Sequence, residues 1–452
     1  MTSLTCFKSY DVRGKVPEEL NEDIAFRIGR AYAQFLKPSA VAVGYDIRLT
    51  SQQLCDSLAK GLMAGGADVI NIGQCGTEEI YFAAFNEHVD GGICVTASHN
   101  PKNYNGMKFV GKDAKPISGD SGLREIQALA EANQFTDAEF EGCISYKDPQ
   151  NAYLDHLLKY VDLASLPPLK IVVNAGNGGA GKVIDLLEPH LPFEFIKLNH
   201  EADGNFPNGV PNPLLVENRQ ATQQAVIDNK ADLGIAWDGD FDRCFFFDES
   251  GEFIEGYYLV GLLAQTLLKQ QPGSPIVYDP RLYWNTVEMI EQAGGKPVMS
   301  KTGHAFIKET MRREQAIYGG EMSAHHYFSS FAFCDNGTIP WLLICQLIAD
   351  SKKTISQLVS ERMALYPCSG EINLRVNDAA TILTELSSHY QQEAKLLDHT
   401  DGLGIEFENW RFNVRMSNTE PLLRVNVEAR NDKQLMDDKT QELLKLIKGL
   451  AE

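Results

Sequence analysis

The first part of the chain alternates short apolar runs with segments in which apolar residues recur at helical spacing. Residues 40–44 form a continuous apolar run that predicts a buried strand. Apolar positions over residues 54–63 predict the helix that follows, with Thr50 and Gln53 forming a capping box at its start. Two more strands are predicted at residues 69–72 and 93–95. Strand, helix and strand joined by short links predict parallel pairing in a layered α/β domain.

The same rhythm begins again at residues 170–173 and at residues 276–278, the second time after a helical pattern over 257–268. The end of the chain differs. Residues 404–428 alternate apolar and polar positions around a tight loop, between helical patterns near 381–397 and 435–447. We therefore expect three similar α/β domains with mixed sheets, at 1–150, 151–250 and 251–366, followed by a smaller α+β domain at 367–452.

Charge and cysteine content narrow the class of protein. The chain has 41 Lys and Arg against 61 Asp and Glu, a net charge of −20, which would repel nucleic acid and an anionic membrane. The chain has nine cysteines, an odd number, and no Cys-x-x-Cys motif. This pattern disfavours a disulfide framework or a zinc site and predicts reduced thiols in a cytoplasmic protein. The densest apolar run, residues 339–349, is shorter than the roughly 20 residues of a membrane helix. We expect no nucleic-acid partner and no membrane association.

Ser98 follows the predicted strand at 93–95, in the segment Thr-Ala-Ser-His-Asn-Pro. A serine before Asn-Pro commonly caps a turn. It can also carry a phosphoryl group, whose charge of about −1.5 to −2 needs a cation beside it.

Three carboxylates provide a place for such a cation. Asp238, Asp240 and Asp242 follow the apolar run 233–237 at alternate positions, and oxygen ligands of this kind suit Mg²⁺. A polar turn between two strands is the simpler alternative. A calcium EF-hand is excluded because Arg243 stands where that loop requires glycine and the flanking segments have strand patterns.

A third polar segment, residues 415–421, has arginines on both sides of it, Arg411 and Arg424. Hydroxyls, an amide and an arginine fork suit a phosphate that is bound and not cleaved. A capped hairpin turn with surface arginines is the alternative.

Residues 176–182 fit the spacing of a nucleotide-binding P-loop, G-x-x-x-x-G-K. The next position must be Ser or Thr to bind Mg²⁺, and here it is Val183. A glycine-rich turn between a strand and a helix explains the segment better.

Ser98, the aspartate segment and residues 320–323 each follow a predicted strand in a separate α/β unit. Ligands of open α/β sheets bind beyond the carboxyl ends of the strands, so these loops are expected to face one shared cleft. A phosphorylatable hydroxyl and a divalent-cation site together indicate phosphoryl transfer.

Six segments together resemble the α-D-phosphohexomutase family, which includes phosphomannomutases and phosphoglucomutases, over essentially the whole chain. In chain order they are FKSYDVRG (7–14), TASHNP (96–101), DGDFDR (238–243), KTGH (301–304), GEMSAH (320–325) and RMSNTEP (415–421). Within the family the likeness is greatest to bacterial phosphomannomutases of the kind that feed GDP-mannose synthesis.

The resemblance implies four domains around a central cleft, with Ser98 as the phosphoserine and Mg²⁺ held by Asp238, Asp240, Asp242 and a phosphoserine oxygen. It implies sugar recognition by Glu321 and Ser323. It implies a phosphate grip by Arg415, Ser417, Asn418 and Thr419. Further matches to cleft positions are Tyr10, Arg13, His99, Lys108, Arg243, His304 and His325. Arg281 stands where many relatives have lysine, and Ala324 where glycine is common.

The implied reaction is the reversible conversion of mannose 6-phosphate and mannose 1-phosphate through a 1,6-bisphosphosugar, which also serves as activator. Lys108 and His304 are candidate acid–base groups by the same resemblance. Alternatives are a phosphoglucomutase, a dual-specificity phosphohexomutase, a phosphosugar phosphatase and a non-enzymatic phosphosugar-binding protein. We expect a monomer or homodimer, with a hinge near residues 368–370.

Overall fold

The computed structural model describes residues 3–416 and 422–451. The chain forms two compact units. The first unit contains residues 1–253 and 325–352, and the second contains residues 254–324 and 353–452. None of the helices in the described ranges is long and apolar enough to cross a membrane.

The amino-terminal domain of the first unit is built on a six-stranded mixed sheet with the order β1-β5-β4-β2-β3-β6. β2 pairs in parallel with β3 and β4, as the sequence predicted, whereas β5 is antiparallel to both β4 and β1. Its strands are β1 (Val12–Lys15), β2 (Ala40–Tyr45), β3 (Asp68–Gln74), β4 (Gly91–Val95), β5 (Tyr104–Gly111) and β6 (Ile144–Tyr146). Its helices are α1 (Glu22–Leu36), α2 (Ser51–Ala64), α3 (Thr77–Asn86) and α4 (Arg124–Ala132).

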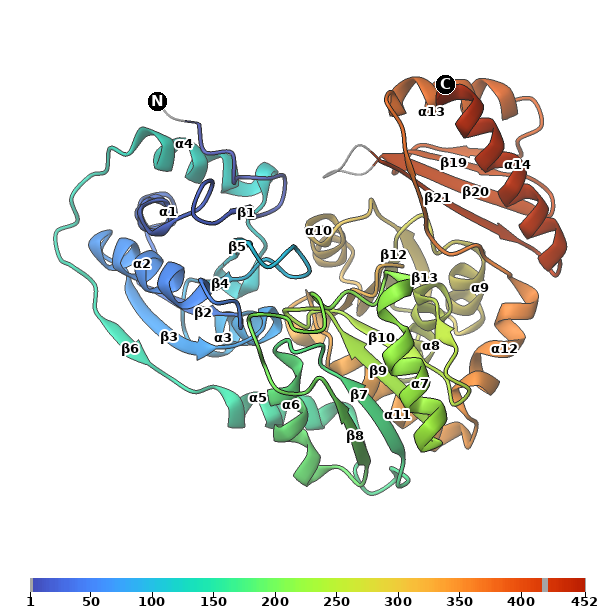
Figure 1. The fold of residues 1–452 in the computed structure, drawn as a ribbon, viewed down its shortest axis with the longest axis horizontal. Coiled ribbons are helices and arrows are strands. Elements are labelled where there is room, and N and C mark those ends of the chain that lie inside the picture. Colours follow the sequence, from blue (N-terminus) through green and yellow to red (C-terminus); the bar gives the residue numbers. More distant parts are fainter. Residues whose placement is uncertain (1–2, 417–421, 452) are drawn as a thin grey trace. The chain divides into compact units, whose positions relative to one another are not determined.

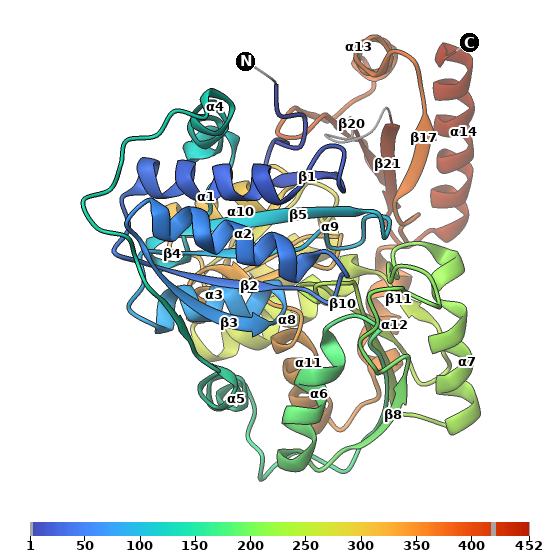
Figure 2. The same cartoon turned by 60° about the vertical axis from the view of Figure 1, so that its left-hand side comes forward.

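Successive residues of β2 face opposite sides of this sheet, because side chains alternate along a strand. Val41 and Val43 belong to the core that contains α1 and α2, whereas Ala42 packs with Ile80 and Ala83 of α3. Figures 1 and 2 show α1 and α2 together on one face and α3 on the other. The fully apolar pattern of 40–44 follows from this burial on both faces.

The capping box predicted at Thr50 is wrong. Thr50 is the residue before α2, but its side chain makes no capping hydrogen bond and its backbone is already helical, at φ −96° and ψ −7°. Its hydroxyl instead accepts a 2.9 Å hydrogen bond from Asn105 Nδ2. A tertiary partner has replaced the local one.

The second domain of the first unit has the strand order β11-β10-β9-β7-β8. β7 is parallel to β8 and β9, and β9 is antiparallel to β10. The strands are β7 (Lys170–Asn174), β8 (Glu194–Leu198), β9 (Leu233–Trp237), β10 (Cys244–Phe247) and β11 (Phe253–Ile254). The helices are α5 (Gln150–Leu157), α6 (Ala180–Leu187) and α7 (Gln220–Asn229).

The third α/β domain contributes strands to both units. In the second unit, β12 (Pro275–Tyr278) is parallel to β13 (Lys296–Met299) and to β14 (Tyr318–Gly320). In the first unit, β15 (His326–Phe328) is antiparallel to β16 (Cys334–Asp335). The helices are α8 (Gly256–Gln270), α9 (Trp284–Gln292), α10 (His304–Glu314), α11 (Ile339–Ser351) and α12 (Ile355–Leu365).

The carboxyl-terminal domain, in the second unit, is an antiparallel sheet with the order β17-β21-β20-β19-β18, and Figure 1 shows α13 and α14 against it. The strands are β17 (Ile372–Arg375), β18 (Leu396–Asp398), β19 (Leu403–Glu406), β20 (Trp410–Met416) and β21 (Leu422–Ala429). The helices are α13 (Ala379–Tyr390) and α14 (Lys433–Ala451).

The helix predicted over 381–397 is too long at its end. The helix α13 stops at Tyr390, which packs against Phe407 and Trp410, and β18 follows as an edge strand. Leu396 and Leu397 continued the apolar pattern, yet both side chains are exposed. A short apolar run does not by itself distinguish a helix end from an edge strand.

Candidate active site

Ser98 lies in the loop that joins β4 to β5, with a left-handed backbone at φ +48°. Its backbone N–H donates to Thr96 Oγ1 at 3.0 Å, and Thr96 Oγ1 donates to Asp46 Oδ2 at 2.7 Å. A non-glycine residue in this region costs free energy and persists where its surroundings fix it. The loop conformation at Ser98 is therefore fixed by side chains from another strand end.

Arg48 is a second support of the loop. Its guanidinium donates to the backbone oxygens of Ser98 at 2.9 Å, Asn100 at 2.6 Å, Pro101 at 2.9 Å and Tyr104 at 2.9 Å. The residue is buried. Arg48 and Asp46 were not among the predicted residues, although both lie within three residues of the carboxyl end of β2 and a position after a strand was the signal at Ser98.

The three aspartates lie in the turn between β9 and β10, and all three are buried. One ligand oxygen from each lies within 4.8 Å of the others. Among the described residues, the Oδ1 atoms of Asp238, Asp240 and Asp242 have no hydrogen-bond partner. Burying charged oxygens without partners is costly, so this arrangement fits a divalent cation with oxygen ligands.

Ser98 and the aspartate turn meet in the first unit. Ser98 Oγ donates a 2.7 Å hydrogen bond to Asp238 Oδ2. A Cβ on Gly239 would lie 2.5 Å from the Ser98 carbonyl oxygen, so this approach requires glycine. Arg243 donates to the same Asp238 oxygen through Nε at 2.9 Å and Nη2 at 2.6 Å.

Lys108, on β5, binds the other two carboxylates. Its Nζ donates to Asp240 Oδ2 at 2.7 Å and to Asp242 Oδ2 at 2.5 Å. Burial disfavours the charged form, but these carboxylates raise the pKa of Lys108, which stays an ammonium ion. Burial and the neighbouring Asp240 raise the pKa of Asp242 to about 7. The repulsion among these carboxylates is what a second positive charge would relieve.

His99 is held neutral. Burial lowers its pKa, and the positive charges of Arg243 and Arg13 lower it further. Its Nδ1 lies 3.1 Å from Ser98 Oγ and 2.5 Å from Arg243 Nη2. Arg13 donates to Asn100 Oδ1 at 2.5 Å and to Asp11 Oδ2 at 2.8 Å. Tyr10 is half-buried two residues before β1.

His325 reaches the same cluster from the segment before β15. Its backbone pairs with that of Arg243, and its Nδ1 lies 2.9 Å from Asp335 Oδ2 and 4.0 Å from Asp242 Oδ1. Asp335 was missed because nothing in the sequence connects it with residue 242. The first unit therefore brings together half of the predicted residues, namely Arg13, Ser98, His99, Lys108, Asp238, Asp240, Asp242, Arg243 and His325.

In the second unit, Arg281 follows β12 and is held by Asp279. Its Nε lies 3.0 Å from Asp279 Oδ1 and its Nη2 lies 2.6 Å from Asp279 Oδ2. Its Nη1 donates to Glu371 Oε2 at 2.6 Å. Glu321, after β14, lies 3.9 Å from Arg281 Nη2 and accepts a 3.0 Å hydrogen bond from Ser323 Oγ.

The remaining predicted residues of the second unit are described unequally. Arg415 is buried on β20, and Ser417, Asn418 and Thr419 lie outside the described residues. His304 begins α10 directly after Gly303, whose φ is +125°. Ala324 has a φ of +69°, the left-handed region that glycine adopts without strain.

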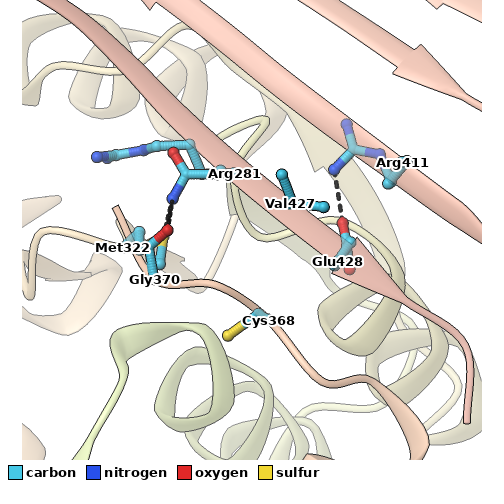
Figure 3. A pocket seen from close by; sticks show the side chains of 8 residues that line it. Arg281, Met322, Cys368, Gly370, Arg411, Val427 and Glu428 are labelled. Atoms are coloured by element: carbon cyan, nitrogen blue, oxygen red, sulfur yellow. Dashed lines mark hydrogen bonds and ion pairs between the residues drawn. The ribbon is translucent and has the colours of Figure 1, made fainter. Parts of the chain in front are cut away.

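A small pocket in the second unit, about large enough for one water molecule, lies beside Arg281, Cys368 and Glu428 (Figure 3). Arg411 Nη1 donates to Glu428 Oε1 at 2.6 Å, as the figure shows. This ion pair occupies Arg411, as Asp279 and Glu371 occupy Arg281, so that Arg415 and Arg424 are the better candidates for ligand binding.

The P-loop-like segment is used structurally. Lys182 Nζ donates to the backbone oxygen of Gln74 at 3.2 Å. Gly176 adopts a φ of +59° at the turn after β7. The glycine-rich turn that the sequence favoured is what the structure contains.

Four family profiles match the chain, all described as phosphoglucomutase/phosphomannomutase. Three describe alpha/beta/alpha domains I, II and III, at residues 5–137, 151–251 and 255–366, and the fourth a C-terminal domain at 371–445.

The chain is 58% identical over 456 residues to a phosphomannomutase of Escherichia coli, covering 99% of this chain and 100% of that one. A Xanthomonas campestris protein named "Phosphohexose mutases" is 57% identical over 447 residues, with 99% and 100% covered. A crystal structure of a phosphoglucomutase/phosphomannomutase family protein from Burkholderia thailandensis is 31% identical, with a TM-score of 0.89 over 100% of this chain and 99% of that one.

Proposed function

Because this chain belongs to the phosphoglucomutase/phosphomannomutase family, we propose that it is a phosphomannomutase that interconverts mannose 6-phosphate and mannose 1-phosphate. The observation that carries the proposal is the 2.7 Å hydrogen bond from Ser98 Oγ to Asp238. It places an alcohol that can carry a phosphoryl group at a cluster of carboxylates suited to Mg²⁺.

The proposed chemistry has two transfers. Phosphorylated Ser98 gives its phosphoryl group to the free hydroxyl of the bound sugar phosphate: the Ser98 O–P bond breaks and a sugar O–P bond forms. The sugar hydroxyl loses a proton and the Ser98 oxygen gains one, so that Ser98 is again a free hydroxyl. The resulting 1,6-bisphosphosugar turns round, and its other phosphoryl group returns to Ser98. The product is the isomeric monophosphate. A trace of bisphosphosugar serves as activator because it phosphorylates Ser98.

The chain's own residues position these groups. Arg48 and Asp46 fix the loop that carries Ser98, and Arg243 orients the Asp238 carboxylate. Lys108 contacts two carboxylates, so we assign it a role in charge balance. Asp238, Asp240 and Asp242 would hold Mg²⁺, which offsets the negative charge of the transferring group.

For the second unit, we propose that Glu321 and Ser323 read the sugar hydroxyls and that Arg415, with Ser417, Asn418 and Thr419, binds the phosphate that is not transferred. His304 and Arg281 are further proposed substrate contacts of the second unit, and Tyr10, Arg13 and His325 are those of the first. The proposal needs no partner other than the phosphosugar substrate. We propose that the protein acts in the cytoplasm as a monomer or homodimer and that its product supplies GDP-mannose synthesis.

A dual-specificity phosphohexomutase is the second candidate, since the Xanthomonas campestris relative carries the broader name "Phosphohexose mutases" at 57% identity. Initial rates on mannose 1-phosphate and glucose 1-phosphate, each with a trace of its 1,6-bisphosphate, separate the candidates. A phosphomannomutase favours the mannose substrate at least about tenfold in kcat/KM. Equal rates would establish dual specificity, and release of inorganic phosphate in place of isomer would establish a phosphatase.

A further inference from the structure

Glu371 lies among three arginines of the second unit. Its Oε2 lies 2.6 Å from Arg281 Nη1 and 3.8 Å from Arg415 Nη2, and its Oε1 accepts a 3.1 Å hydrogen bond from Arg424 Nη1. These arginines lower the pKa of Glu371 despite its burial, so it is a carboxylate at neutral pH.

Two of these arginines depend on Glu371 for charge balance. Arg281 already has the bidentate carboxylate of Asp279. Arg415 and Arg424 lie directly opposite each other on β20 and β21, and like charges in such a pair repel. Asp401 lies 3.9 Å from Arg415 Nε, about as far as Glu371 lies from Arg415 Nη2, so the two carboxylates share the charge balance of Arg415, whereas Glu371 alone contacts Arg424 among the described residues.

The same two arginines also have unused donors. Within the described part of the chain, Arg415 Nε and Arg424 Nε are buried and have no hydrogen-bond partner. Buried guanidinium donors without acceptors call for a further anion. Glu371 and Arg424 keep 19% and 24% of their side-chain surface exposed, so an anion from solvent can reach them.

A carboxylate and a phosphate compete for these guanidinium groups, because both present paired oxygens to an arginine fork. With Glu371 and Asp401 both in place, the positive charges of Arg415 and Arg424 are balanced. Without the Glu371 carboxylate they would leave one net positive charge to attract a ligand. The carboxylate therefore lowers the affinity of this position for a phosphate dianion.

We propose that Glu371 is a displaceable internal counter-ion that exchanges with the substrate phosphate at Arg415 and Arg424. The inference rests on the proposed function, in which a bisphosphosugar must be released from the phosphate grip, turn and be bound again. By returning to the arginines as phosphate leaves, Glu371 keeps the grip from holding the intermediate too tightly. It is a positioning residue and not a group that reacts.

The anchoring of Glu371 fits this exchange. The preceding residue, Gly370, has a φ of +69°, and its carbonyl accepts a 2.9 Å hydrogen bond from Asn426 Nδ2. The next residue, Ile372, begins β17 and pairs with Val425. Because the backbone is held on both sides, the Glu371 side chain can leave the arginines while the sheet stays intact.

The test compares Glu371→Gln with wild type and with Glu385→Gln, which removes the same charge from an exposed position on α13. Titration calorimetry of the full chain uses inorganic phosphate and mannose 6-phosphate at low and high salt. We expect Glu371→Gln to lower the Kd for both by about five- to tenfold at low salt and by less at high salt. Glu385→Gln leaves both values unchanged.

Steady-state kinetics adds a measurement that a merely structural role would not produce. Glu371→Gln should lower KM for mannose 1-phosphate and also lower kcat, because release becomes slower. An unchanged or higher Kd for inorganic phosphate would overturn the proposal, since Glu371 would then not compete with phosphate. If Glu371→Gln fails to fold, Glu371→Asp takes its place, because a side chain shorter by one methylene weakens the contact with the arginines. A lower Kd for phosphate in Glu371→Asp then supports the proposal, and an unchanged or higher Kd overturns it.

The two proposals fail separately. Phosphate affinity is measured without turnover. If the wild-type chain has no mutase activity but Glu371→Gln binds phosphate more tightly than the wild type does, only the proposed function is refuted. If the wild-type chain is an active mutase and Glu371→Gln leaves its Kd for phosphate unchanged, only the counter-ion proposal is refuted.

Discussion

Ser98 and Asp238 are 140 residues apart in sequence and are joined by a 2.7 Å hydrogen bond. Two turns make the contact, one after β4 and one after β9, and both follow buried strands whose loops open at the carboxyl end. The close approach depends on Gly239, because any side chain there would strike the Ser98 carbonyl. The hydroxyl is thus held at the aspartate cluster by backbone geometry as well as by its own hydrogen bond.

Arg48→Lys tests the support of the serine loop. Lysine keeps the charge but lacks the planar fork that contacts four carbonyls. We expect kcat to fall at least about tenfold and stability to fall by about 2 kcal/mol, because buried carbonyls lose donors. Turnover and thermal unfolding measure both effects. Arg124→Lys, on the exposed side of α4, is the control, and equal kcat in the two variants would show that Arg48 does not position Ser98.

Asp242→Asn tests the cation site. The three unpartnered carboxylate oxygens predict that millimolar Mg²⁺ raises the thermal midpoint of the wild-type chain, because a ligand bound to the folded state stabilises it. The variant lacks one charged ligand, so the shift should largely disappear. A chelator should abolish wild-type turnover, and added Mg²⁺ should restore it. If Mg²⁺ raised the thermal midpoint of Asp242→Asn as much as that of the wild type, the ion would bind at another position.

Glu78 predicts a pH dependence of stability in the first unit. It is fully buried, and its carboxyl oxygens accept hydrogen bonds from Tyr153 Oη at 2.5 Å, Thr338 Oγ1 at 2.6 Å and Gly337 N at 2.6 Å. Burial raises its pKa from 4.5 to about 8 in spite of these donors. Between pH 4.5 and about pH 8, Glu78 therefore stays protonated in the folded chain and is deprotonated in the unfolded chain.

The contribution of Glu78 is therefore complete below pH 4.5 and is lost as pH rises towards about 8. The loss is about 1.4 kcal/mol per pH unit. Glu78→Gln cannot titrate, so its thermal midpoint should fall less than that of wild type between pH 5.5 and 7.5. Other titrating groups are common to both proteins and cancel in the comparison. Parallel midpoints across this range would contradict the raised pKa.

Lys182→Ala separates phosphoryl transfer through Ser98 from nucleotide hydrolysis. The lysine donates to a backbone carbonyl in an exposed setting, a contact of small energetic value. We expect the variant to keep mutase turnover within about twofold of wild type. A loss of activity comparable with that of Ser98→Ala would instead require a catalytic P-loop.

Much of the fold was predictable because the strands buried on both faces read as continuous apolar runs. Residues 40–44, 170–173 and 276–278 each became a strand, and the alternating pattern of the last domain became an antiparallel sheet, although the polar residues Arg411, Asn413 and Arg415 of β20 are buried as well. Two local predictions failed where tertiary contacts outweighed local pattern. Thr50 bonds to Asn105 and not to its own helix, and β18 replaces the end of a predicted helix.

From the residue pattern alone, the candidate site was predictable only where residues stand close together in a motif, whereas Lys108 and Arg281 followed from the family resemblance. Ser98 and the three aspartates have neighbours and spacings that indicate chemistry, so the sequence alone singles them out. Arg48, Asp335 and Glu371 are single charged residues whose roles depend on partners far away in sequence. No local pattern distinguishes such residues from surface charges, and only the folded chain brings them to their partners.

Locating the phosphoryl group after reaction with a 1,6-bisphosphohexose tests the central claim most directly. Intact mass spectrometry of the wild-type chain should show a gain of one phosphoryl group, and peptide fragmentation should place it on Ser98. Addition of mannose 6-phosphate should remove the phosphoryl group from Ser98 while bisphosphosugar and the isomeric monophosphate form. Ser98→Ala should neither gain the phosphoryl group nor convert substrate. Turnover by Ser98→Ala, or a phosphoryl group at another residue in an active wild-type chain, would contradict the account.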